Sequence, residues 1–184
     1  MRFGPIVRED REGREIILRS AEEEDAAELI RYLKTIAEES RFLTNEPEEV
    51  NLTEEAERAF LASKRDAERE LMLIARDRET GRHIGNCSFL SVGGKKRVLH
   101  RCGVGIALYR EFCGRGIGRI MLETVLGAAK EAGYEQAELE VVTENNRAVR
   151  LYETLGFKIC GTLPRNMKYA DGTYADVYWM AKEL

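Results

Sequence analysis

The fold is decided by one stretch, Gly105-Ile106-Ala107-Leu108-Tyr109-Arg110-Glu111-Phe112-Cys113-Gly114-Arg115-Gly116-Ile117-Gly118-Arg119. An apolar strand runs here into closely spaced glycines that open a helix. Glycines let the backbone approach an anion closely, and the unpaired N–H groups and the dipole of a helix N-terminus favour negative charge. Arg115 and Arg119 add positive charge. The stretch therefore predicts a phosphate-binding site.

Two other glycine-rich phosphate sites fit this stretch poorly. A dinucleotide-binding Rossmann site needs G-x-G-x-x-G within repeated βαβ units, but Arg119 stands in the place of the third glycine. A Walker P-loop needs Gly-Lys followed by Ser or Thr, which this stretch lacks. Tight packing between strand and helix would also explain the glycines, and this alternative stays open.

The flanking sequence predicts a crossover. A strand over 98–109 leads into a helix over 116–132, and a second strand over 137–141 follows. Apolar residues recur at helical spacing in the helix: Gly118, Met121, Leu122, Val125, Leu126 and Ala129. A further helix contains Ala148 and is closed by Gly156. Because the two strands flank one helix, we expect them to run parallel.

The rest of the chain predicts two more helices and several strands. Ser20 and Glu23 form a capping box that starts the first helix, and Thr53 caps the second. Asp171-Gly172 predicts a hairpin turn. The remaining strands are expected over 15–19, 71–75, 84–92, 157–163 and 173–180. No repeat or linker divides the chain, so residues 1–184 are expected to form a single α/β domain.

Composition excludes several classes of protein. The 184 residues include 29 Lys plus Arg and 33 Asp plus Glu, whereas nucleic-acid-binding domains are usually strongly basic. The longest uncharged apolar stretch, 102–109, is too short to span a membrane, and charge interrupts the first ten residues before any export signal. The cysteines lack C-x-x-C spacing, and the only histidines are His83 and His100. We therefore expect no metal site, reduced thiols and a cytoplasmic location.

Two motifs resemble those of the GNAT superfamily of acyl-CoA-dependent N-acetyltransferases. The central family motif is Arg or Gln, then x-x-Gly-x-Gly or Ala, and residues 113–118 match all but its first position. The second family pattern is Asn-x-x-Ala-x-x-Leu-Tyr-x-x-x-Gly-Phe. It is matched here by Asn145, Ala148, Leu151, Tyr152, Gly156 and Phe157.

The resemblance implies a mixed, mostly antiparallel sheet with helices on both faces. Its central strands, near 98–109 and 137–142, would run parallel and splay apart, and acetyl-CoA would enter the opening. Pantetheine would pair with the backbone of Ile106, Ala107 and Leu108. The pyrophosphate would lie on the amides from Gly114 to Arg119, which are those of Gly114, Arg115, Gly116, Ile117, Gly118 and Arg119.

Cys113 departs from the family motif. It replaces an Arg or Gln near the pyrophosphate. Because the backbone amides remain, we expect acetyl-CoA binding to be weakened rather than lost. The side chain is interpreted as a small apolar filler, with a redox-sensitive thiol as the alternative.

Acyl transfer needs a proton donor, an oxyanion site and a base. By the resemblance, Tyr152 would protonate the departing thiolate, with a core aromatic as the alternative. Asn145 would cap its helix or bond the pantetheine arm, and a backbone N–H near Leu108 would hold the oxyanion. The base is not assigned, because the strand 98–109 contains no Asp or Glu. Glu140, acting through water, and Glu46 are candidates.

The sequence therefore predicts transfer of an acetyl group from acetyl-CoA to a primary amine, by direct attack in a ternary complex. A small metabolite or a protein N-terminus could be the acceptor, with Tyr169 and Tyr174 of the 171–172 hairpin walling its site. The acidic first half, with 22 acidic and 14 basic side chains over 1–80, suits a cation. The alternatives are an acyl-CoA-binding sensor or scaffold without turnover, and a nucleotide-binding oxidoreductase. A homodimer is left open.

Overall fold

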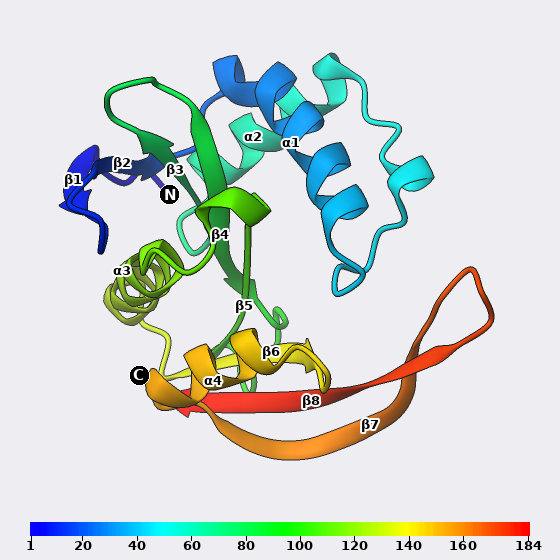
Figure 1. Ribbon diagram of the computed structural model, residues 1–184. Helices are drawn as coiled ribbons and strands as arrows, with labels where there is room; N and C mark the ends of the chain where they lie inside the picture. Colours follow the sequence, from blue (N-terminus) through cyan, green and yellow to red (C-terminus); the bar gives the residue numbers. More distant parts are fainter.

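The computed structural model describes residues 1–184, which form an eight-stranded sheet and four α-helices (Figure 1). The strands are β1 (Ile6–Glu9), β2 (Glu15–Ser20), β3 (Leu71–Asp77), β4 (His83–Ser91), β5 (Arg101–Leu108), β6 (Gln136–Val142), β7 (Lys158–Lys168) and β8 (Tyr174–Glu183). The helices are α1 (Ala26–Glu39), α2 (Glu54–Asp66), α3 (Ile117–Glu131) and α4 (Asn146–Thr154). None of these helices is long and apolar enough to span a membrane.

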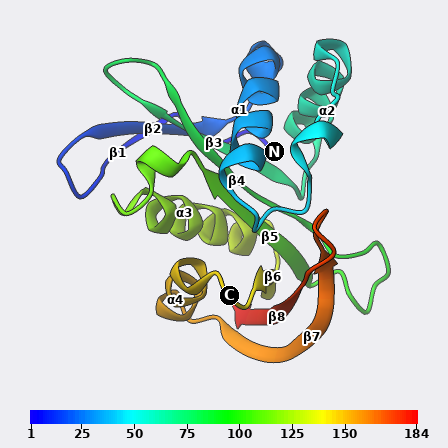
Figure 2. The ribbon, with the colours of Figure 1, turned by 45° about the vertical axis from the view of Figure 1, so that its right-hand side comes forward.

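The sheet has the order β1-β2-β3-β4-β5-β6-β8-β7, and only β5 and β6 pair in parallel. Helices α1 and α2 cover one face, while α3 and α4 cover the other (Figure 2). This confirms the expected fold, a mostly antiparallel sheet with helices on both faces and one central parallel pair.

The larger core lies between the sheet and α3. The apolar positions expected from helical spacing are buried on α3, with Gly118 alone only half-buried: Met121, Leu122, Val125, Leu126 and Ala129. Thr53 caps α2 as expected, because its side chain accepts a hydrogen bond from the Ala56 N–H at 3.2 Å. The Asp171-Gly172 turn also forms, with Gly172 at φ +83°. Local sequence signals were sufficient at each of these places.

The start of α1 differs from the sequence prediction. Ser20 does not cap a helix, because it ends β2 and its hydroxyl accepts a hydrogen bond from the Phe3 N–H at 3.2 Å. A short 3₁₀ turn, Glu23–Asp25, intervenes instead, and its capping box is formed by Glu22 and Asp25. The predicted pairing of Ser20 with Glu23 was therefore wrong, because a distant segment takes the serine hydroxyl.

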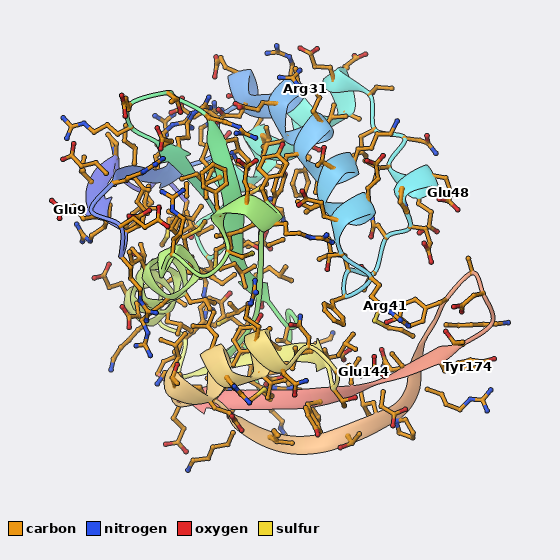
Figure 3. All side chains as sticks on the ribbon, in the orientation of Figure 1. Glu9, Arg31, Arg41, Glu48, Glu144 and Tyr174 are labelled. Atoms are coloured by element: carbon orange, nitrogen blue, oxygen red, sulfur yellow. The ribbon has the colours of Figure 1, made fainter.

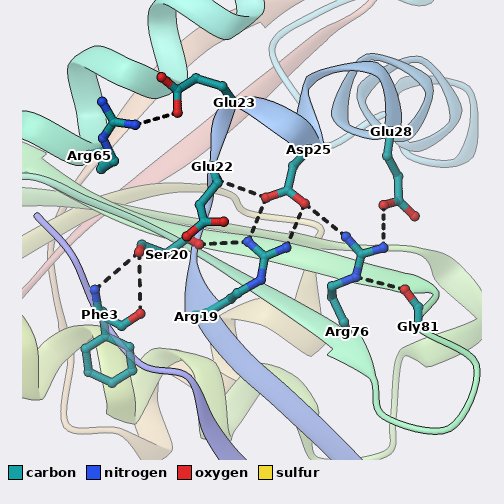
Figure 4. Close-up of polar contacts among 10 residues, drawn as sticks. All are labelled: Phe3, Arg19, Ser20, Glu22, Glu23, Asp25, Glu28, Arg65, Arg76 and Gly81. Atoms are coloured by element: carbon teal, nitrogen blue, oxygen red, sulfur yellow. Dashed lines mark hydrogen bonds and ion pairs between the residues drawn. The ribbon is translucent and has the colours of Figure 1, made fainter.

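A cluster of ion pairs fastens this turn to the sheet (Figure 4). Asp25 binds Arg19 of β2 with both carboxylate oxygens at 2.7 Å, and Arg76 of β3 lies 3.0 Å from the same carboxylate. Burial raises the pKa of Asp25, but the hydrogen bond from Arg19 and the other favourable contacts outweigh burial and lower it overall. The carboxylate thus stays ionised and holds α1 in place over β2 and β3.

His83 of β4 is buried under α1. Its ring packs edge-on against Tyr32, with 4.6 Å between ring centroids, and its Nε2 atom has no hydrogen-bond partner. Burial lowers the pKa of His83 from 6.5 to about 4. The imidazole is therefore neutral at pH 7 and serves as a packing group.

We expect His83 to make the protein less stable in mild acid. The unfolded chain binds a proton at this residue near pH 6.5, but the folded protein does so only near pH 4. The stability that the neutral His83 contributes is therefore fully present above pH 6.5 and is lost as the pH falls towards 4. The loss should be about 2–3 kcal/mol. Urea unfolding from pH 7 to 4 measures it. In His83→Phe the free energy of unfolding should fall less between pH 7 and 4, whereas in His100→Gln it should fall as in the wild type. An unchanged fall in His83→Phe would show that His83 is not the cause.

Candidate functional site

The predicted phosphate-binding segment forms a nest of unpaired amides. Gly114 and Gly116 have φ of +90° and +84°, a left-handed conformation that glycine adopts without strain. The backbone N–H groups of residues 114–118 donate no hydrogen bond within the chain. The amides on either side are used, since Cys113 donates to Arg110 and Arg119 donates to Gly116. The segment therefore presents a continuous run of free donors at the N-terminus of α3.

The side chains around this nest are less available than the sequence predicted. The Arg115 guanidinium is almost buried and binds the Asp10 carboxylate, with Nε at 2.8 Å. Arg119 pairs with Glu123 at 2.9 Å. The Cys113 thiol lies 3.7 Å from the carbonyl oxygen of Tyr109 and is half-buried. The nest is therefore mainly a backbone site, and the positive charge of Arg115 and Arg119 is already paired.

The central strands open just beyond the parallel pairing. Strand β5 pairs with β6 only from Arg101 to Gly103, although β5 continues to Leu108. Tyr109 donates its N–H to Ile84 at 3.0 Å, and Val92 donates to Arg101 at 3.3 Å. The backbone groups of the odd-numbered residues of β5 therefore point to β4, because the direction alternates along a strand.

Because the direction of the backbone groups alternates along β5, the three residues predicted to pair with pantetheine do not all face the opening. Ile106 and Leu108 direct their backbone groups into the opening beside β6, whereas those of Ala107 face β4. The Ala107 carbonyl also accepts a hydrogen bond from the Tyr32 hydroxyl at 2.7 Å. The sequence analysis did not identify Tyr32, which holds β5 from the buried face of α1 and contacts Asn86 at 3.0 Å as well.

The second motif spans α4, from its N-cap to the turn that follows the helix. Asn145 is the N-cap, and its Oδ1 accepts a hydrogen bond from the Ala148 N–H at 3.3 Å. Of the two roles expected of Asn145, the helix cap is confirmed, and contact with the pantetheine arm stays a prediction. Tyr152 lies in the last turn of the helix and is 7% exposed, and its ring is edge-on to that of Phe157, with 5.8 Å between the ring centroids.

Tyr152 is suited to donate a proton. Its hydroxyl group makes no hydrogen bond within the chain but is not completely enclosed. Burial raises the pKa of Tyr152 above its ordinary value of 10. The phenol is therefore protonated at neutral pH and has a free O–H group, while burial also makes it a weaker acid than a solvated tyrosine.

A groove of about 340 Å³ crosses β4, β5, β6 and β8 where the central strands separate. Gly103 and Gly105 leave space on β5, since a Cβ atom at Gly103 would meet no other atom within 4 Å. Glu140 and Trp179 are directly opposite neighbours on β6 and β8. Further lining residues include Ser88, Leu90, Val104 and Glu138. The groove is apolar on its walls and acidic on β6.

The two groove carboxylates differ in their contacts. Glu138 is buried and binds Arg101, with an oxygen 2.7 Å from the second guanidinium nitrogen. The hydrogen bond from Arg101 lowers the pKa of Glu138. Glu140 is exposed and makes neither an ion pair nor a hydrogen bond. Glu46, the other candidate base, is the N-cap of a 3₁₀ turn at Pro47–Glu49, where its backbone N–H donates to the Glu49 carboxylate at 2.8 Å, and it does not line the groove. Glu140 is thus the candidate with a free carboxylate on the groove.

The β7–β8 hairpin lies against the loop that follows α1. The Arg41 guanidinium, in the loop after α1, lies 4.3 Å from the centroid of the Tyr169 ring. Figure 3 shows Arg41 beside the hairpin that carries Tyr174. Phe42 also packs against a small core that contains Val177 of β8. The predicted aromatic hairpin therefore contacts the loop between α1 and α2.

A mixed sheet that opens between two parallel strands, beside a glycine-rich helix N-terminus, defines the N-acetyltransferase class of fold. The sequence model of the GNAT acetyltransferase domain matches residues 15–158. The chain belongs to the GNAT acetyltransferase family.

Solved structures agree with this assignment. An acetyltransferase of the GNAT family from Streptococcus pneumoniae is 29% identical, with a TM-score of 0.86 over 92% of this chain and 99% of that chain. A phosphinothricin acetyltransferase from Sinorhizobium meliloti, in complex with acetyl-CoA, shares the fold at 21% identity, with a TM-score of 0.79 over 92% and 88%. A ribosomal-protein-alanine N-acetyltransferase from Brucella melitensis also shares the fold, at 22% identity and with a TM-score of 0.77 over 91% of this chain and 99% of that chain.

One curated protein also matches part of the chain. An uncharacterized protein of Mycobacterium leprae is 38% identical over 78 residues, which are 42% of this chain and 20% of that protein. The matched region is thus a minor part of that relative.

Proposed function

We propose that residues 1–184 form one acetyltransferase domain, which transfers the acetyl group of acetyl-CoA directly to a primary amine. The observation that carries this proposal is the run of unpaired amides at residues 114–118 beside the open edge of β5. Free N–H groups at a helix N-terminus suit a diphosphate, and an open strand edge suits an amide-containing arm. Both features lie on one continuous segment of the chain.

The backbone would hold acetyl-CoA at two places. The amides of residues 114–118 would bind the diphosphate, and the backbone groups of Ile106 and Leu108 would pair with pantetheine. Ala107 would support this strand through its hydrogen bond with Tyr32 rather than contact the ligand. A backbone N–H near Leu108 would stabilise the oxyanion that forms when the amine attacks the thioester carbonyl.

Tyr152 would supply the proton for the departing thiolate. A phenol is protonated at neutral pH even at its ordinary pKa of about 10, and the Tyr152 hydroxyl group has no competing partner within the chain. The reaction forms an amide bond and breaks the thioester bond. The ammonium nitrogen loses two protons in all, one before attack and one from the tetrahedral adduct, the CoA sulfur gains one from Tyr152, and the net proton goes to solvent.

Glu140 would accept the amine proton, directly or through water. An alkylammonium has a pKa of about 10 and must lose a proton before attack. Glu140→Gln should lower kcat/KM about 10-fold at pH 7, because a water relay retains part of the base function. The deficit should shrink towards pH 10, where the amine deprotonates unaided. Steady-state rates across pH measure it, with Glu144→Gln as the control; an unchanged rate at pH 7 would contradict the role of Glu140.

The groove supports an amine acceptor with an apolar portion. Glu140 is a free carboxylate for the ammonium group, and Trp179 and Leu90 offer apolar surface, each more than a third exposed. Two structural neighbours are named for different acceptors, a ribosomal-protein alanine and phosphinothricin. The fold therefore leaves the identity of the amine open.

An amine panel tests the proposed function. Thermal unfolding with acetyl-CoA reports binding, and release of free thiol with each amine reports turnover. We expect stabilisation by acetyl-CoA and amine-dependent thiol release with at least one primary amine. Stabilisation without thiol release across metabolite amines, polyamines and peptides with free N-termini would instead favour an acyl-CoA sensor.

A further inference from the structure

The tip of the β1–β2 hairpin is fastened to the amide nest. The Arg11 N–H donates a hydrogen bond to the Arg115 carbonyl at 2.9 Å. In the opposite direction, the Arg115 side chain binds Asp10 and lies 3.4 Å from Glu12. Figure 2 shows the hairpin reaching out on the side of the sheet edge, next to the loop that precedes α3. Backbone and side-chain contacts thus hold residues 10–12 against the nest.

This arrangement places the Arg11 side chain on Gly116. A Cβ atom at Gly116 would lie 2.9 Å from Cγ and 3.1 Å from Nε of Arg11. Gly116 is at the centre of the unpaired amides. The long side chain of Arg11 therefore lies against the middle of the 114–118 segment.

Arg11 is the uncompensated cation of this hairpin tip. Asp10 and Glu12 both bind Arg115, and Arg14 lies 4.0 Å from Glu12. The Arg11 guanidinium is exposed and makes no ion pair or side-chain hydrogen bond. Its charge adds to that of the helix N-terminus, because the neighbouring arginines at positions 115 and 119 are already neutralised.

We infer that Arg11 binds the diphosphate of acetyl-CoA from above, as a side-chain clamp opposite the backbone amides of residues 114–118. This inference rests on the proposed function. Arg115 acts as a positioning residue, since its contacts with Asp10 hold the hairpin in place. Arg11 precedes the stretch matched by the family model, residues 15–158, so the family match does not assign this role. Guanidinium groups suit phosphate oxygens because they offer several donors in one plane.

Calorimetric titration of Arg11→Ala with acetyl-CoA tests the clamp. We expect about 10-fold weaker binding than in the wild type, the effect of losing one charge-assisted contact. Arg11→Lys should recover part of the affinity. Arg14→Ala, on the same hairpin and also exposed, should bind as the wild type does. Thermal unfolding of each variant verifies that the hairpin change leaves the fold intact.

Two analogues identify which group Arg11 contacts. Arg11→Ala should lose the same affinity for 3′-dephospho-acetyl-CoA, which retains the diphosphate, and none for S-acetylpantetheine, followed by NMR titration. If Arg11→Ala binds acetyl-CoA as tightly as the wild type does, Arg11 does not bind the diphosphate. The inference is also wrong if affinity falls for acetyl-CoA but not for the 3′-dephospho analogue, or if it falls for S-acetylpantetheine as well. If the wild type itself fails to bind acetyl-CoA, the proposed function fails instead.

Discussion

Replacing Tyr152 by phenylalanine is expected to lower kcat about 100-fold while acetyl-CoA binding stays nearly unchanged. The substitution removes one hydroxyl group that makes no hydrogen bond within the protein, so it should cost little stability. The ring and its contact with Phe157 are retained. Without the phenol, the thiolate must leave unprotonated or take a proton from water. Pre-steady-state and steady-state rates with a saturating amine, together with calorimetric Kd values, measure the two effects separately.

Tyr134→Phe is the matched control for this change. Tyr134 is also buried, but its hydroxyl group donates to the Arg69 carbonyl at 2.9 Å, away from the nest and the groove. Its loss should reduce stability by about 1 kcal/mol and leave kcat unaltered. If Tyr152→Phe turned over as fast as the wild type, Tyr152 would be a core aromatic and the proton would have another source.

Replacing Gly116 by alanine is expected to weaken acetyl-CoA binding about 100-fold, the effect of losing two charge-assisted backbone contacts. Gly116 has φ +84°, and a Cβ atom there would meet the Arg11 side chain. An alanine must therefore displace Arg11 and leave the left-handed conformation, which turns the neighbouring amides away from the nest. Stability should also fall by about 1–2 kcal/mol. Calorimetry and urea unfolding measure the two consequences.

Gly127 provides the control within the same helix. It lies exposed in the interior of α3, and a Cβ atom there would meet nothing within 4 Å. Gly127→Ala should stabilise the protein by about 0.5–1 kcal/mol and leave Kd unchanged. Wild-type affinity in Gly116→Ala would show that the local amide geometry does not contribute to ligand binding.

The elements with strong local signals were predictable from sequence. Helix α3 has a regular apolar spacing, and the Thr53 and Asn145 caps are encoded within a few residues of the helices they start. The glycines that form the nest were identified for the same reason, since their conformation is a property of the adjacent chain. The parallel pairing of β5 and β6 followed from the single helix between them.

The parts that depend on distant contacts were not predictable. Arg115 was expected to add charge at the phosphate site, but Asp10, 105 residues away in the sequence, neutralises it. Ser20 was expected to cap a helix, but Phe3 takes its hydroxyl group. Strand β1 was missed because it has only four residues and no alternation. No local sequence pattern predicts these two contacts or this strand.

The groove could not be located from the sequence, because its lining depends on the registers of the strands. Glu140 was considered from sequence as one of two candidate bases, but its position opposite Trp179 depends on the pairing of β6 with β8. The space above Gly103 likewise depends on where β5 leaves β6. The cytoplasmic location and the homodimer stay predictions of the sequence.

Calorimetric titration of the folded wild-type protein with acetyl-CoA tests most directly whether the amides at the start of α3 bind the CoA diphosphate. We predict saturable heat with one ligand per chain and a Kd within about 1 μM–1 mM, together with a Kd about 100-fold higher in Gly116→Ala. Absence of any heat from correctly folded wild-type protein would contradict it.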